Sequence, residues 1–77
     1  MIELDARRLM CPMPVIKTQN IIKTLLPGDN VRVTCTDPGV MQDIPAWCRI
    51  NGHTVLKTEE IDHEFILTIE VGNDSIG

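Results

Sequence analysis

The sequence predicts an α+β fold, a two-layer α/β sandwich with the element order β-α-β-α-β-β. Four short segments alternate apolar and polar residues, which is typical of strands with one buried face. Between the first three of these segments, apolar residues recur at intervals of three and four, which is typical of helices that pack on a sheet. We therefore expect residues 1–77 to form a single domain, with a four-stranded mixed sheet, both helices on one face and the other face partly open.

The first strand is expected at residues 2–5, where Ile2 and Leu4 alternate with acidic residues, and a loop is expected over residues 6–10. Prolines then open a helix that should run over residues 12–26, and Pro27-Gly28-Asp29 should end it and turn the chain. The stripe of this helix that faces the core comprises Val15, Thr18, Ile22, Leu25 and Leu26.

The second strand is expected at residues 31–36, again from alternation. A proline inside a helix removes a hydrogen bond, so Pro45 argues for a second helix that starts late, with Asp43 as its N-cap. Asn51-Gly52 should end that helix. Residues 53–59 and 64–71 should form a hairpin around the polar turn Glu60-Ile61-Asp62-His63, with an apolar face that comprises Phe65, Leu67, Ile69 and Val71.

The tetrapeptide Cys11-Pro12-Met13-Pro14 places a thiol at the start of the first helix. Proline is tolerated in a first helical turn, because the amide that it lacks has no partner within the helix there. With Cys11 as N-cap, the Met13 N–H is the one amide of this turn left to meet the sulfur. The alternative is that Cys11 is a small buried apolar residue at the end of a loop.

Positive charge near Cys11 favours a thiolate. Arg7, Arg8 and Lys17 lie close in sequence, and a helix N-terminus carries partial positive charge. With Lys23 they would form a positive rim for an acidic protein partner, although a scattered solvated surface explains these charges as well. Met13 and Ile16 fall off the buried stripe within one turn of Cys11, so we expect them to form an exposed docking patch.

The remaining thiols and imidazoles are expected to be structural. Cys35 and Cys48 fall on apolar faces, while His53 at the start of a strand and His63 in the hairpin turn are expected to be ordinary surface residues. Three dispersed cysteines contain no paired ligand motif, so the sequence predicts no disulfide, no metal site and no cofactor.

Charge and hydropathy exclude several classes. The formal net charge is −4, which argues against direct binding of nucleic acid. Residues 1–50 carry six Lys/Arg against five Asp/Glu (+1), and residues 51–77 carry one against six (−5), so Cys11 lies in the more basic part. The first ten residues contain no apolar targeting core, and no apolar run approaches the length of a membrane span, so we expect a cytoplasmic protein.

Several spaced motifs together resemble the TusA/SirA-type sulfur-carrier family, over nearly the whole chain. They are Leu4-Asp5, Cys11-Pro12-Met13-Pro14, Pro27-Gly28, Asp37-Pro38-Gly39 and Asp43-Ile44-Pro45-Ala46-Trp47-Cys48. The resemblance implies the sandwich described above. It also implies a Cys11 that accepts sulfane sulfur as a persulfide from a cysteine desulfurase or a rhodanese-like donor and passes it to an acceptor protein.

Membership of this family implies a relay rather than a final catalyst. In relatives the sulfur reaches 2-thiouridine in tRNA, other sulfur-bearing cofactors or sulfur oxidation enzymes. One departure is Arg8, which stands where the family usually has glycine, so the loop is expected either to take a different path or to present an extra positive charge. Two alternatives remain open: a non-catalytic regulatory or protein-binding module, and a redox-sensing thiol, although the latter usually needs a nearby resolving cysteine.

Overall fold

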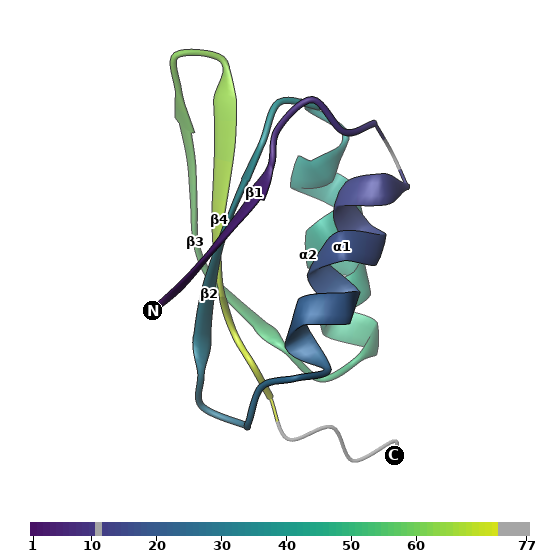
Figure 1. The fold of residues 1–77 in the computed structure, drawn as a ribbon, viewed down its shortest axis with the longest axis vertical. Coiled ribbons are helices and arrows are strands. Elements are labelled where there is room, and N and C mark those ends of the chain that lie inside the picture. The colour runs from purple at the N-terminus through teal and green to yellow at the C-terminus, as the bar shows by residue number, and fades with distance from the viewer. Residues whose placement is uncertain (11, 73–77) are drawn as a thin grey trace.

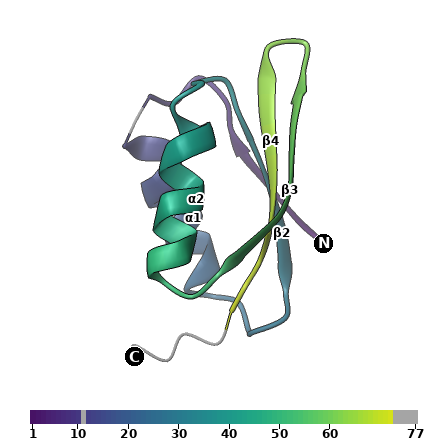
Figure 2. The same ribbon diagram turned by 180° about the vertical axis from the view of Figure 1, so that it is seen from behind.

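The computed structural model describes residues 1–10 and 12–72 and has the predicted element order, with both helices on one face of a four-stranded sheet (Figures 1 and 2). None of the helices in these residues is long and apolar enough to cross a membrane. The elements are β1 (Ile2–Ala6), α1 (Met13–Ile22), β2 (Asn30–Cys35), α2 (Val40–Ile50), β3 (Thr54–Ile61) and β4 (Glu64–Glu70).

The sheet is mixed, as predicted, with the strand order β1-β2-β4-β3. β1 and β2 pair in parallel, which requires a crossover connection, and α1 supplies it. The other two strand pairs are antiparallel. In the parallel pair Ala6 lies opposite Cys35, so both strands end at the same edge of the sheet and the two following loops lie next to each other.

The core lies between the sheet and the two helices. It takes every second residue of β1, β2 and β4, as the alternation predicts, together with one face of each helix. The buried apolar residues are Leu4, Ala6, Ile22, Val31, Val33, Cys35, Val40, Ile44, Cys48, Leu67, Ile69 and Val71.

The first helix is shorter than predicted, because α1 ends at Ile22 instead of residue 26. The amides of residues 24–25 bond to carbonyls three residues earlier, which tightens the chain into a turn. Leu26 precedes Pro27, which disfavours helical backbone, and the Leu26 N–H donates to the Asp29 carboxylate. Leu26 is therefore 73% exposed and does not belong to the buried stripe.

The second helix starts earlier than predicted: Gly39, not Asp43, is its N-cap, and Pro45 lies inside the helix. The Gly39 N–H donates to the Asp37 carboxylate at 3.0 Å, so the chain already turns before Val40. Residues 40–43 then donate their amides to the carbonyls of residues 37–39. With these bonds at its start, the helix tolerates the loss of the one backbone hydrogen bond that Pro45 cannot donate. It ends at Asn51, as predicted.

The hairpin turn is tighter than predicted. β3 and β4 extend to Ile61 and Glu64, so the turn consists of Asp62 and His63 alone rather than residues 60–63. Both turn residues have positive φ, 51° and 65°, which is the geometry of a type I′ turn. The hairpin tip projects beyond the helices at the end where β1 and β2 finish (Figures 1 and 2).

His63→Gly should stabilise the fold, because glycine adopts the left-handed backbone of this position without the steric cost that histidine bears. We expect the free energy of unfolding in urea to rise by about 0.5 kcal/mol. Glu60→Gly is the matched control: Glu60 lies in the regular part of β3, so the same new residue should lower stability there. Equal losses in both variants would contradict the turn assignment.

Candidate functional site at the start of α1

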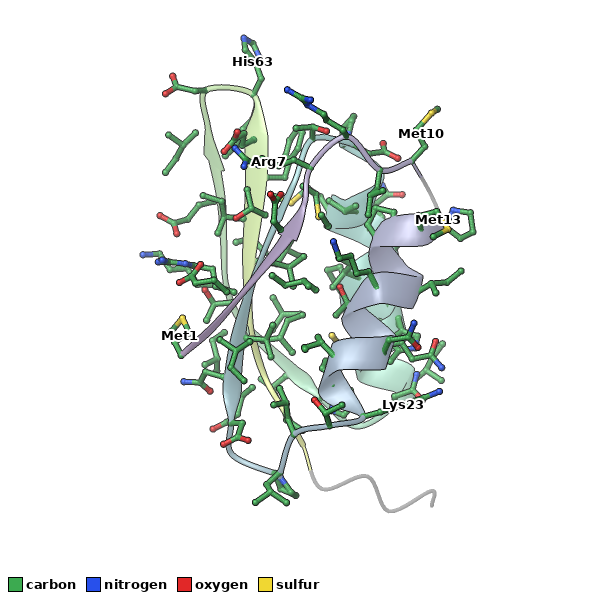
Figure 3. The ribbon with its side chains drawn as sticks, viewed as in Figure 1. Met1, Arg7, Met10, Met13, Lys23 and His63 are labelled. Carbon is green, nitrogen blue, oxygen red and sulfur yellow. The ribbon has the colours of Figure 1, made fainter. Side chains whose placement is uncertain are left out.

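The residues that flank Cys11 gather at one end of the molecule. Met10 and Met13 lie near the start of α1 and Arg7 lies at the same end on the side of the sheet, whereas Lys23 lies at the far end of α1 (Figure 3). Lys23 is therefore not part of a positive rim near Cys11, contrary to expectation. Cys11 itself lies outside the described residues.

The Met13 amide is already occupied. Its N–H donates to the Met10 carbonyl oxygen at 2.8 Å. Pro12, rather than Cys11, is the N-cap of α1. The prediction that the Met13 N–H is free to meet the sulfur is thus wrong. This amide instead links Met10, the residue before Cys11, to Met13, the first residue of α1.

The prolines start the helix as expected. Pro14 is the second residue of α1 and is buried, while Pro12 stays exposed. The Pro14 carbonyl accepts a hydrogen bond from the buried Thr18 hydroxyl at 2.8 Å. The buried Thr18 hydroxyl is thereby satisfied by a carbonyl of its own helix.

Two of the basic residues are turned towards β1. Arg7 Nε lies 2.9 Å from the Asp5 carboxylate, and Arg7 Nη1 lies 3.4 Å from that of Glu64. Hydrogen bonds from Arg7 lower the pKa of Asp5 to about 2, and the same pair raises the pKa of Arg7. Lys17 Nζ donates to the Asp5 carbonyl at 2.7 Å. Asp5 and Glu64 therefore offset much of the local positive charge.

Arg8 has a left-handed backbone with φ of 67°, and its N–H donates to the Thr36 hydroxyl oxygen at 2.8 Å. This is a conformation that glycine adopts freely and that other residues rarely adopt. The loop therefore keeps a backbone path that glycine would also fit. Arg8 adds an exposed positive charge to it, which is the second of the two outcomes expected for this position. No ion pair of Arg8 is found with any residue that the structure describes.

Apolar side chains surround the position of Cys11 in sequence. Met13 and Ile16 are 47% and 40% exposed, which confirms the predicted exposure. Met10, which the sequence analysis assigned only to a loop, is 77% exposed and projects outwards at the same end (Figure 3). Its proximity to Cys11 in sequence was the available signal. We call Met10, Met13 and Ile16 the apolar patch.

The other two thiols are buried, as predicted. Burial raises the pKa of Cys48 to about 11, and burial together with the carboxylates of Asp37 and Asp5 does the same for Cys35. A thiol with such a pKa is almost entirely protonated near neutral pH and is a poor nucleophile. Within residues 1–10 and 12–72, no group of three or more His, Cys, Asp or Glu side chains is arranged to hold a metal ion.

The two histidines differ from each other. His63 is exposed in the hairpin turn, as expected. His53 precedes β3 and is not an ordinary surface residue: its Nδ1 accepts the Gly72 N–H at 2.9 Å, and its ring lies 5.1 Å from that of Trp47 between centroids. These contacts assign His53 a structural role at the end of the molecule away from Arg7.

Titration of Asp5 tests the ion pair at this site. Carboxyl-carbon NMR should give a midpoint near pH 2 for Asp5, and Arg7→Gln should return it towards 3.8. Because the pKa is lowered in the folded state, the pair stabilises the fold above about pH 4 and loses this effect as the pH falls towards 2. Arg32→Gln, which removes a different surface arginine paired with Glu3, is the control. An unchanged Asp5 midpoint in Arg7→Gln would contradict the pairing.

Comparison with known proteins points to one family. The family model described as Sulfurtransferase TusA matches residues 2–71. The chain is 40% identical over 57 residues to the sulfur carrier protein TusA of Pseudomonas paraeruginosa, which covers 74% of this chain and 72% of that protein. It is 43% identical over 58 residues to the putative sulfur carrier protein YrkF of Bacillus subtilis, covering 75% of this chain but only 31% of that longer protein.

A solved structure agrees with these matches. The crystal structure of a SirA-like protein from Desulfitobacterium hafniense superposes with a TM-score of 0.83 at 27% identity, covering 95% of this chain and all of the other. Fold and sequence thus lead to the same conclusion. The chain belongs to the TusA sulfurtransferase family, in which the Pseudomonas relative is named a sulfur carrier.

Proposed function

We propose that this protein relays sulfur on Cys11. The Cys11 thiolate attacks the outer sulfur of a donor persulfide, a new S–S bond forms, and the donor thiolate leaves. An acceptor thiolate then attacks the outer sulfur of the Cys11 persulfide, and the Cys11 thiolate leaves. The two exchanges balance without an external oxidant or reductant.

The burial of Cys35 and Cys48 carries this proposal. A persulfide survives as a carried group only if no neighbouring thiol attacks it, because such an attack forms a disulfide and releases sulfide. Both other thiols are buried and have a pKa of about 11, so neither is available as a nucleophile near neutral pH. The same burial removes both as resolving cysteines, which weakens the alternative of a redox-sensing thiol.

The surroundings favour a protein as the direct partner. The apolar patch presents adaptable methionines beside the position of Cys11, as a surface that serves more than one partner would. A cleft of about 480 Å³ lies at the other end of the molecule, lined by residues that include Lys23, Trp47 and His53. A small substrate held there would be far from Arg7 and Met10.

The donor we propose is a cysteine desulfurase or a rhodanese-like protein, and the acceptor is another protein thiol. The destination is thiolation of tRNA to 2-thiouridine or another branch of sulfur metabolism. The net charge of −4 supports delivery through a protein rather than direct contact with tRNA. A reducing cytoplasm, where free thiols persist, is the compartment that fits this chemistry.

Intact-mass spectrometry tests the relay directly. After incubation with a cysteine desulfurase and cysteine, the protein should gain one sulfur atom, and a reductant should remove it. Cys11→Ser should gain none, whereas the matched control Cys35→Ala/Cys48→Ala should gain one. No gain with either a desulfurase or a rhodanese-like donor would favour the protein-binding module. A gain in Cys11→Ser would assign the sulfur to another residue.

Met13→Gln tests the apolar patch without adding charge. The change should lower affinity for the sulfur-donor protein by about tenfold, in line with the loss of a buried apolar side chain of this size, and should leave the fold intact. Leu26→Gln is the control, since Leu26 is 73% exposed and lies beyond the other end of α1. Calorimetric titration measures both. Equal affinities for Met13→Gln and the unmodified protein would exclude the patch from the interface.

A further inference from the structure

Two consecutive backbone amides in the loop that leads to Cys11 donate hydrogen bonds to side chains. The Arg7 N–H donates to the Asp5 carboxylate at 3.0 Å, and the Arg8 N–H donates to the Thr36 hydroxyl oxygen at 2.8 Å. A left-handed backbone at a residue other than glycine persists only where its surroundings impose it. Thr36 supplies such a constraint on Arg8 from 28 residues away in sequence.

The sheet register is the reason that Thr36 can reach Arg8. Ala6 and Cys35 are paired at the ends of two parallel strands, so the residues that follow each strand are neighbours. Arg7, Arg8 and Thr36 line a surface hollow together with Asp5 and with Glu64 from the hairpin. Glu64 also contacts Arg7, so both arginines of the loop are held by residues outside it.

We propose that Thr36 is a positioning residue for sulfur transfer. Its hydroxyl holds Arg8 in the left-handed conformation and thereby fixes the course of the chain three residues before Cys11. This role rests on the proposed function of Cys11 as the sulfur carrier. When the hydroxyl is removed, φ of Arg8 should shift to negative values. The residues on either side of Cys11 should then adopt the conformation that binds the sulfur-donor protein less often.

Three variants separate this role from general stability. Thr36→Val removes the acceptor and keeps the side-chain shape, Thr36→Ser restores the acceptor, and Thr34→Val makes the same substitution two residues earlier in β2. The measurement is the single-turnover rate of sulfur gain from a persulfide-loaded cysteine desulfurase. Thr36→Val should be about fivefold slower at an unchanged final stoichiometry, consistent with the loss of one hydrogen bond, while the other two should match the unmodified protein.

A second measurement tests the contact between Thr36 and Arg8 without a sulfur-donor protein. Scalar couplings measured by NMR give φ of Arg8, which should leave the left-handed region in Thr36→Val and remain there in Thr36→Ser. An unchanged rate or an unchanged φ in Thr36→Val would overturn the positioning role. If the unmodified protein gains no sulfur, the sulfur-carrier proposal itself fails, and the couplings still decide whether Thr36 holds Arg8.

Discussion

The parallel pairing of β1 with β2 is the constraint on which the site depends. It requires a crossover, and α1 is that crossover, so the first turn of this helix must lie just after the loop that leaves β1. The Ala6–Cys35 register also places the two loops that follow these strands next to each other. The loop before Cys11 is consequently held from outside by Thr36 and by Glu64 of the hairpin. The loop that leads to α1 is thus held by contacts from β4 and from the end of β2.

Burial makes two of the three thiols unreactive. Cys35 ends the central strand β2 and Cys48 faces the core from α2, and burial in both places raises the pKa of the thiol so that it stays protonated near neutral pH. The basic residues near the site contribute less free positive charge than their number in the sequence indicates, because neighbouring groups pair with them. Arg7 is paired with Asp5 and Glu64, and Lys17 contacts the Asp5 carbonyl. We therefore propose that apolar contact at the exposed Met10 and Met13 contributes more to partner selection than a broad positive field does.

The sequence predicts the layers of this fold because alternation and helical spacing are local signals that burial enforces. It fails where one particular hydrogen bond decides the local backbone. The bond from the Gly39 N–H to the Asp37 carboxylate turns the chain before Val40, so α2 starts ahead of Pro45, and the Met10 carbonyl accepts the Met13 amide. The left-handed backbone of Arg8 cannot be predicted from the residues around it. The residue that supports this backbone, Thr36, lies 28 residues later, and strand pairing brings it next to Arg8. The burial of Cys35 and Cys48 was predictable, since both lie on apolar stripes.

Burial suppresses Cys35 and Cys48 as nucleophiles, and we propose that Cys11 is the one thiol that reacts. The most direct test is the pH dependence of iodoacetamide alkylation of the native protein, followed by intact mass and peptide mapping. We expect a single modification, on Cys11, across the neutral pH range, because burial keeps Cys35 and Cys48 protonated, and three modifications after unfolding. Early modification of Cys35 or Cys48, or no modification of Cys11 in the native protein, would contradict this proposal.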